Sequence, residues 1–210
     1  MRFSKVPIIL FFVLISCHDG EENCHQSSLQ LETLINSYQE RESYDSEAYP
    51  LGLFTREYYQ SEAKYAANQM QYFDCIEMDE LSETEQISAK LLKFVLQDKI
   101  DYYTFERFLN PLLSDAGFHS NLNYHIQPIN SFEEAKTYLN KLNAIPVFVD
   151  QHFVNLREGL KKGVSQPKII FKGYESTYDD HIVDDYLDSS FYEPFKNLPD
   201  RFTPSQKDSL

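Results

Sequence analysis

The chain of 210 residues contains six histidines and 33 acidic residues, the side chains that most often bind metal ions or transfer protons. No histidine begins a His-Glu-x-x-His pattern, in which two imidazoles share a helix face and bind zinc. The sequence also has neither a glycine-rich phosphate loop nor a Gly-x-Ser-x-Gly motif. It therefore predicts no catalytic residue, no metal ligand and no cofactor in this chain. The histidines are His18, His25, His119, His125, His152 and His181.

The densest polar cluster lies between residues 179 and 188, where His181 stands among aspartates. If this stretch is a helix, His181 faces Asp184 and Asp185, and a hard cation or zinc could bind there. The alternative is a solvated acidic face opposite the apolar residues Ile182, Tyr186 and Leu187 of the same helix. That interpretation is favoured, because runs of charge usually stay in water.

The remaining histidines of the mature chain give weaker signals. His119 and His125 flank a long loop and could face a cleft, but a spacing of six residues in a loop is not that of metal ligands. His152 adjoins an apolar face that includes Phe153. We therefore expect His152 to be packed or hydrogen-bonded rather than to act as a base.

Cys17 is the residue whose surroundings predict a definite chemistry. Arg2 and Lys5 precede an apolar run from Val6 to Ile15, which is too short to cross a bilayer but matches the central region of a secretory signal. The following Leu-Ile-Ser-Cys resembles a bacterial lipobox, in which a peptidase cuts before a cysteine that carries a diacylglyceryl thioether. The sequence therefore predicts lipid attachment at Cys17, the alternative being a buried helix with an incidental cysteine.

This interpretation divides the chain into three parts. Residues 1–16 form the signal peptide, residues 17–27 form a polar tether that begins with an acidic stretch, and residues 28–210 form a helical domain. We expect the protein in the bacterial cell envelope, bound to the membrane through its lipid and most simply at the outer membrane. Acidic residues behind the anchor resemble the surface-export signals of some lipoproteins, although a solvated tether explains the same charges.

Two further cysteines, Cys24 and Cys75, remain in the mature chain. Outside the cytoplasm they could form a disulfide, and closing a loop of roughly 50 residues would stabilise the fold by about 4 kcal/mol in the chain-entropy picture. Two separate buried thiols are the alternative. The absence of a Cys-x-x-Cys pattern argues against zinc binding or redox chemistry at these residues.

The net charge of −14 excludes one class of partner. Removal of the signal peptide takes away Arg2 and Lys5 and makes the chain still more acidic. Such a surface repels phosphate backbones, so nucleic-acid binding is not expected.

The apolar residues recur with a helical period, and the chain is predicted to be all-α. Leu31, Leu34, Ile35 and Tyr38 mark a first helix. A second stripe consists of Ala63, Ala66, Ala67, Met70 and Phe73, and its alanines would let a neighbouring helix approach closely. Ser82 and Glu85 form a capping box before a third helix. That helix carries Ile87, Leu91, Phe94 and Val95 on one face and Leu92, Leu96 and Ile100 on an adjacent face, so it is predicted to be central.

The second half of the chain is less regular. Residues 109–130 lack a period and would be reasonable as a long loop only if they packed on something outside this chain. A second capping box at Ser131 opens a helix that Pro146 either kinks or divides, and Gly163 caps its end. A last helix is expected around residues 182–187.

The final residues indicate a further helix start. Thr203 suits an N-cap and Pro204 the first turn, yet the sequence stops at Leu210 before two turns are complete. A helix this short is marginal, which predicts a truncated protein. A frayed natural tail is the alternative.

From about residue 28 to the end, the order of features resembles the bacterial domain-of-unknown-function 885 family, whose members are large helical proteins and often lipoproteins. The matching stretches are Leu91-Leu92-Lys93-Phe94 through Asp98, Asn110-Pro111-Leu112-Leu113, residues 133–146 (EEAKTYLNKLNAIP), and Leu156-Arg157-Glu158-Gly159 with Gly163 and Gln166-Pro167. The last of these is the most specific, and it is structural rather than catalytic.

The family resembles all-helical zincin metallopeptidases, with a His-Glu-x-x-Pro-Gly-His metal motif far downstream that these 210 residues do not contain. The resemblance implies an irregular multi-helix array, the N-terminal part of a larger zincin-like domain, that forms one wall of a cleft. It implies zinc and a peptide substrate only for a full-length relative, and this chain alone would be inactive. The alternative is a self-sufficient helical lipoprotein that binds a partner or ligand in the cell envelope, for example in glycan uptake.

The lipid anchor leads to a direct prediction. The substitution Cys17→Ala removes the thiol that would carry the diacylglyceryl group, so the precursor should stay uncut and should lose metabolic labelling by a radioactive fatty acid. The matched variant Cys75→Ala should keep the label. Unchanged labelling of the Cys17→Ala protein would refute the anchor.

Overall fold

The computed structural model describes residues 21–112, 117–179 and 181–210, with side chains from residue 26 onward. These residues form α-helices and short 3-10 turns and no strand; an isolated antiparallel bridge joins Leu112 and Gly117. The all-α prediction is confirmed. The α-helices are α1 (Glu21–Gln39), α2 (Arg56–Tyr72), α3 (Glu83–Thr104), α4 (Phe118–Asn121), α5 (Phe132–Lys161), α6 (Ser176–Asp179), α7 (Glu193–Lys196) and α8 (Pro204–Asp208).

The 3-10 turns fill most of the connections between these helices. They are η1 (Phe73–Cys75), η2 (Met78–Glu80), η3 (Arg107–Leu109), η4 (Leu122–His125), η5 (Lys168–Phe171), η6 (Tyr186–Asp188) and η7 (Ser190–Tyr192). Helix α1 begins at Glu21, so the segment predicted as a polar tether is helical from that residue onward. Within the described residues, no helix combines the length and apolarity needed to cross a bilayer.

Helices α1, α2 and α3 pack around the first hydrophobic core. Leu31 and Leu34 of α1, Ala66 of α2, and Leu92 and Leu96 of α3 are buried together. Small residues let α2 approach α3 closely, as their spacing predicted. Ser82 accepts a hydrogen bond from the Glu85 amide, and the Glu85 carboxylate accepts one from the Ser82 amide, so the predicted capping box is present.

Helix α3 is less enclosed than its sequence suggested. Its inner face, which includes Leu96, is buried, but Ile87, Leu91 and Phe94 on the opposite face are 67%, 62% and 70% exposed. The prediction that α3 is central is therefore wrong for the residues that the structure describes. The apolar periodicity of α3 is present, but such a pattern indicates only that a face is apolar and not that another element covers it.

Helix α5, with 30 residues, is the longest of the described helices. It runs without interruption through Pro146, so this proline does not start a new helix. Ser131 caps its first turn by accepting from the Glu134 amide at 3.2 Å, whereas the Glu134 carboxylate binds the Asn130 amide instead of completing a capping box. At the other end Gly163 adopts φ +76°, and the amide of Val164 donates to the Gly159 carbonyl at 2.8 Å, as in a Schellman cap.

The described parts of this range, residues 109–112 and 117–130, do not form a structureless loop. They contain the end of η3 together with α4 and η4, and Phe118 and Leu122 are buried with Leu51 and with Phe148 of α5 in a second core. This segment therefore packs within the chain, contrary to the expectation that it needs something outside it. Its helices are too short to show a periodic pattern in the sequence.

The helix predicted around residues 182–187 is absent. The stretch is irregular up to the short turn η6, and Ile182 and Tyr186 are largely exposed. The helix predicted from Thr203 is present as α8, with a capping box between Thr203 and Gln206. Near this end of the chain, Phe202 is buried against α5 in a third core with Ile129, Ala135 and Tyr138.

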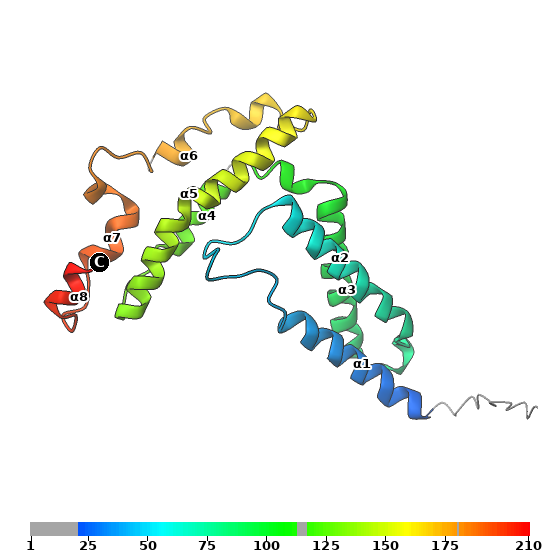
Figure 1. Ribbon diagram of the computed structural model, residues 1–210. Coiled ribbons are helices and arrows are strands. Elements are labelled where there is room, and N and C mark those ends of the chain that lie inside the picture. Colours follow the sequence, from blue (N-terminus) through cyan, green and yellow to red (C-terminus); the bar gives the residue numbers. More distant parts are fainter. Residues whose placement is uncertain (1–20, 113–116, 180) are drawn as a thin grey trace, which may run out of the picture.

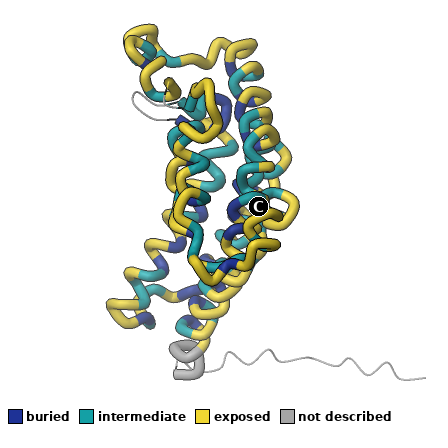
Figure 2. Tube along the Cα trace, turned by 90° about the vertical axis from the view of Figure 1, so that its left-hand side faces the viewer, coloured by how far each residue is buried: buried dark blue, intermediate teal, exposed yellow. Residues whose placement is uncertain are grey.

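The α1–α3 bundle and helix α5 form two layers that converge where α2 begins and α5 ends, and then diverge (Figure 1). The terminal helices α7 and α8 lie along the other half of α5. Buried and exposed positions alternate along the long helices, and none of the described helices is buried over its full length (Figure 2). The cores are thus three separate clusters rather than one.

Candidate functional site

The predicted lipid-attachment residue, Cys17, lies outside the described residues, as does the side chain of Cys24. Cys75 is exposed at the end of η1, so a buried thiol is wrong for this residue. The Cys24–Cys75 disulfide stays a prediction.

The described residues of the acidic cluster do not share a helix: Asp179 ends α6, and Asp188 lies in η6. His181 stacks on Phe191, with ring centroids 5.3 Å apart, and Asp185 accepts a hydrogen bond from the Leu187 amide at 2.9 Å. Among the residues described, no group of three or more His, Cys, Asp or Glu side chains is arranged to hold a metal ion. The helical geometry on which the cation hypothesis depended is therefore missing.

His119 and His125 contact different elements, His119 the helix α6 and His125 the helix α5. His119 Nε2 lies 2.8 Å from Thr177 Oγ1, and that hydroxyl donates to the Tyr174 carbonyl at 2.7 Å. Because the hydroxyl proton is already used, His119 Nε2 must be the donor. Burial, together with nearby His181, lowers the pKa of His119.

His152 is enclosed by aromatic rings. It is 5% exposed, and its ring lies 4.5 Å from those of Phe54 and Phe118 and 4.7 Å from that of Phe148. Neither ring nitrogen has a hydrogen-bond partner among the described residues. Burial therefore lowers the pKa of His152 to about 4, because a charged imidazole would find no compensating group in this cage. The residue is packed, as the sequence suggested.

A polar junction next to this cage fixes the α1–α2 connection on α5. The Phe54 amide donates to Gln151 Oε1 at 2.6 Å, and Asn155 Nδ2 donates to the Phe54 carbonyl at 2.7 Å. Asn155 is buried, so its hydrogen bond is made away from water. Both backbone groups of one loop residue are thus satisfied by two side chains one helical turn apart.

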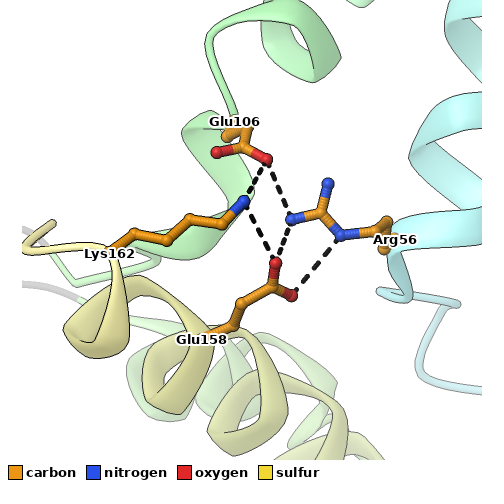
Figure 3. A network of polar contacts seen from close by, with 4 residues as sticks. All are labelled: Arg56, Glu106, Glu158 and Lys162. Carbon is orange, nitrogen blue, oxygen red and sulfur yellow. Dashed lines mark hydrogen bonds and ion pairs between the residues drawn. The ribbon is translucent and has the colours of Figure 1, made fainter.

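Four charged residues extend this junction to α2 and η3 (Figure 3). Arg56 contacts both Glu158 and Glu106, and Lys162 lies 2.6 Å from Glu106 and 3.2 Å from Glu158. Hydrogen bonds from Lys162 and then from Arg56 lower the pKa of Glu106. The Arg56 guanidinium also lies 4.9 Å from the centre of the Phe108 ring. The network is half-exposed, so it positions the elements more than it stabilises them.

Backbone packing completes the junction at Gly159. A Cβ at this position would lie 2.5 Å from the Leu109 carbonyl oxygen, so only glycine lets α5 approach η3 this closely. The residues from Leu156 to Gln166 that carried the family resemblance lie here: Glu158 binds Arg56, Gly159 contacts Leu109, and Gln166 Nε2 donates to the Leu112 carbonyl at 2.9 Å. The motif is structural, as its sequence indicated.

Gln151, Asn155 and Arg56 were not recognised from the sequence. Their partners lie about a hundred residues away, and two of the contacts are made to backbone groups, which leave no trace in side-chain patterns. The only available signal was the cluster of family-like residues that follows them on α5.

The chain matches one family model, described as "Bacterial protein of unknown function (DUF885)", over residues 42–210. No curated protein and no solved structure matches the chain. The matched range contains the junction, the His152 cage and all of α5.

The His152 cage predicts a specific pH dependence of stability. Between pH 4 and 6.5 the unfolded chain binds a proton at this imidazole and the folded chain does not. The free energy of unfolding should therefore fall by up to about 3 kcal/mol as the pH drops through this window. Urea denaturation of the protein and of His152→Phe measures the difference. The variant should lack this loss, and equal pH slopes would contradict the cage.

Proposed function

This chain belongs to the DUF885 family of bacterial proteins of unknown function, and from that premise we propose that it is a lipid-anchored envelope protein of the metallopeptidase-like type that contributes structure rather than catalysis. Its helices form one wall of a cleft whose catalytic groups come from further helical polypeptide. Attachment through Cys17 keeps that wall at the membrane of the cell envelope.

The outer face of α3 carries this proposal. Ile87, Leu91 and Phe94 recur at helical spacing on the side opposite the buried face, and each is more than half exposed. A contiguous apolar stripe on one helix is the usual mark of a surface that packs against another helix. We assign this stripe to contact with the helices that complete the peptidase-like domain.

The described side chains do not fit a zinc site, and no catalytic step is assigned to them. His152 is enclosed by three rings, His119 is held by Thr177, and His125 lies 3.4 Å from the cationic amine of Lys141. Burial and the Lys141 charge lower the pKa of His125. None of these imidazoles stands beside a carboxylate in an arrangement that would bind zinc within the described residues.

A second candidate function has one specific observation in its favour. The part of the segment that the structure describes between residues 117 and 130 packs within the chain, where Phe118, Leu122 and Ile129 are buried against other residues of this chain. A chain that covers its own irregular segment could fold and act alone. In that case it would be a self-sufficient envelope lipoprotein that binds a ligand or partner.

A matched pair of charge substitutions tests the role of α3. Leu91→Lys on the outer face should reduce the fluorescence of a bound hydrophobic dye while changing the free energy of unfolding by no more than about 0.5 kcal/mol. Leu92→Lys on the buried face should destabilise the protein by several times that amount, because it places an unpaired charge in the first core. A weak dye signal from the parent protein would favour the second hypothesis, a self-sufficient envelope lipoprotein.

A peptidase assay completes the test. The purified chain with added zinc should cleave no member of a quenched fluorescent peptide library. Chelator-sensitive hydrolysis by the chain alone would contradict a purely structural role, as would equal destabilisation by the two lysine substitutions.

A further inference from the structure

A cleft of about 340 Å³ lies between the turn Tyr49–Gly52 and one face of α5. The helix contributes Asn140, Asn143 and Gln151, which carry carboxamides along the cleft, and Ala144, Val147 and Phe148, which give it an apolar floor. The turn contributes Tyr49 and, with the residues before it, Glu47. None of these residues belongs to the ion-pair network or to the outer face of α3.

Gln151 presents a donor that the protein itself leaves unused. Its Oε1 accepts from the Phe54 amide at 2.6 Å, which fixes the orientation of the carboxamide and directs Nε2 away from that bond. Nε2 is buried and has no hydrogen-bond partner among the described residues. A buried donor without a partner is uncommon in folded proteins, because it has given up its bond to water.

The turn that forms the opposite wall of the cleft is held in place by hydrogen bonds within its own segment. Asp45 Oδ1 accepts from the amides of Glu47 and Ala48 at 2.9 and 3.0 Å, and the Gly52 amide donates to the Tyr49 carbonyl at 2.9 Å. Gly52 has φ +102°, where a Cβ would lie 2.7 Å from the Phe54 ring. Next to it, Leu51 is buried in the second core. The cleft is thus formed before any ligand arrives.

We propose that this cleft binds a neutral polyhydroxylated ligand, a mono- or disaccharide. A sugar hydroxyl is both donor and acceptor, and a carboxamide is the side chain that offers both within one group. Gln151 Nε2 donates to one hydroxyl oxygen, the amides of Asn140 and Asn143 bind neighbouring hydroxyls, and the Glu47 carboxylate accepts a hydrogen bond from a further hydroxyl. The C–H face of the ring lies on Val147, which is half exposed.

The charges and the backbone around the cleft argue against other ligand classes. No lysine or arginine lines it, and Glu47 is the charged residue among its lining side chains, so a phosphate or carboxylate ligand would meet repulsion. No strand edge occurs among the described residues to pair with an extended peptide. The volume is at the small end of ligand pockets, which suits one or two sugar rings.

The test uses the full chain in a detergent without a sugar head group. Saturation-transfer NMR and titration calorimetry are run with glucose, galactose, mannose, N-acetylglucosamine, maltose and cellobiose, and with di- and trialanine as the peptide probe. At least one sugar should bind and the peptides should not. The proposal would be overturned if the peptides alone bound. It would also be overturned if no sugar in the panel bound at about 20 mM, a concentration that detects weak single sites.

Gln151→Glu is the decisive variant, because a carboxylate oxygen still accepts from the Phe54 amide while the unpartnered Nε2 donor of this lining residue is lost. It should weaken sugar binding at least about tenfold. Gln71→Glu makes the same change of charge at an exposed position of α2 and should leave binding unchanged. If Gln151→Glu unfolds the protein, Asn143→Ala replaces it, with an expected loss of severalfold. Sugar affinity that is equal in the parent and in a folded cleft variant would refute the site.

Discussion

The arrangement of this protein depends on two contacts of helix α5, one with the loop residue Phe54 and one, at Gly159, with the backbone of Leu109. Phe54 has its amide bound by Gln151 and its carbonyl bound by Asn155, while Gly159 lets the backbone of Leu109 come within contact distance. The first contact fixes the connection that leads into α2, and the second fixes the segment that follows α3. Because α2 and α3 pack on each other along their length, these two attachments place the whole first layer relative to α5.

Several other features follow from that docking. The loop that Phe54 anchors also carries Gly52 and Leu51, so the turn above α5 is fixed and the cleft beneath it is preformed. The same docking brings the Phe54 ring against His152 and closes the aromatic cage. The two layers converge only at this end (Figure 1), and the outer face of α3 with Ile87, Leu91 and Phe94 is uncovered. Burial of α3 against α2 and α1 provides the stability of the first layer, and the junction provides its position.

The long helices could be predicted from the sequence because their signals are local. Ser82 with Glu85 and Gly163 mark helix ends through contacts within one turn, and the apolar period of α1 to α3 reports which face is buried. The short elements could not be predicted in this way. Phe118 and Leu122 lie in turns of four residues each, where no period can develop, and they are buried only because α5 lies beside them. The helix predicted over Ile182 to Leu187 is wrong for the opposite reason. The apolar period is present in the sequence, but these residues are exposed in the structure.

The sites were harder to predict than the fold. Sequence patterns drew attention to charged clusters and histidines, yet Gln151 and Asn155, which act on the Phe54 backbone, carry no charge and form no motif. His152 was correctly expected to be packed, but its cage is made by three phenylalanines that are far apart in the sequence. Only the stretch from Leu156 to Gln166 hinted at the junction, through its likeness to a family rather than through its chemistry.

The substitution Gly159→Ala, followed by hydrogen exchange and urea denaturation, tests this docking most directly. In an ordinary helix the change stabilises a protein by up to about 1 kcal/mol, because alanine favours the helical backbone. Here the added Cβ would meet the Leu109 carbonyl, so the protein should be destabilised. Amides near residues 51–56 and 107–110 should exchange faster, while those in the middle of α3 should stay protected. A more stable protein with unchanged exchange at those segments would show that the two layers are held together in some other way.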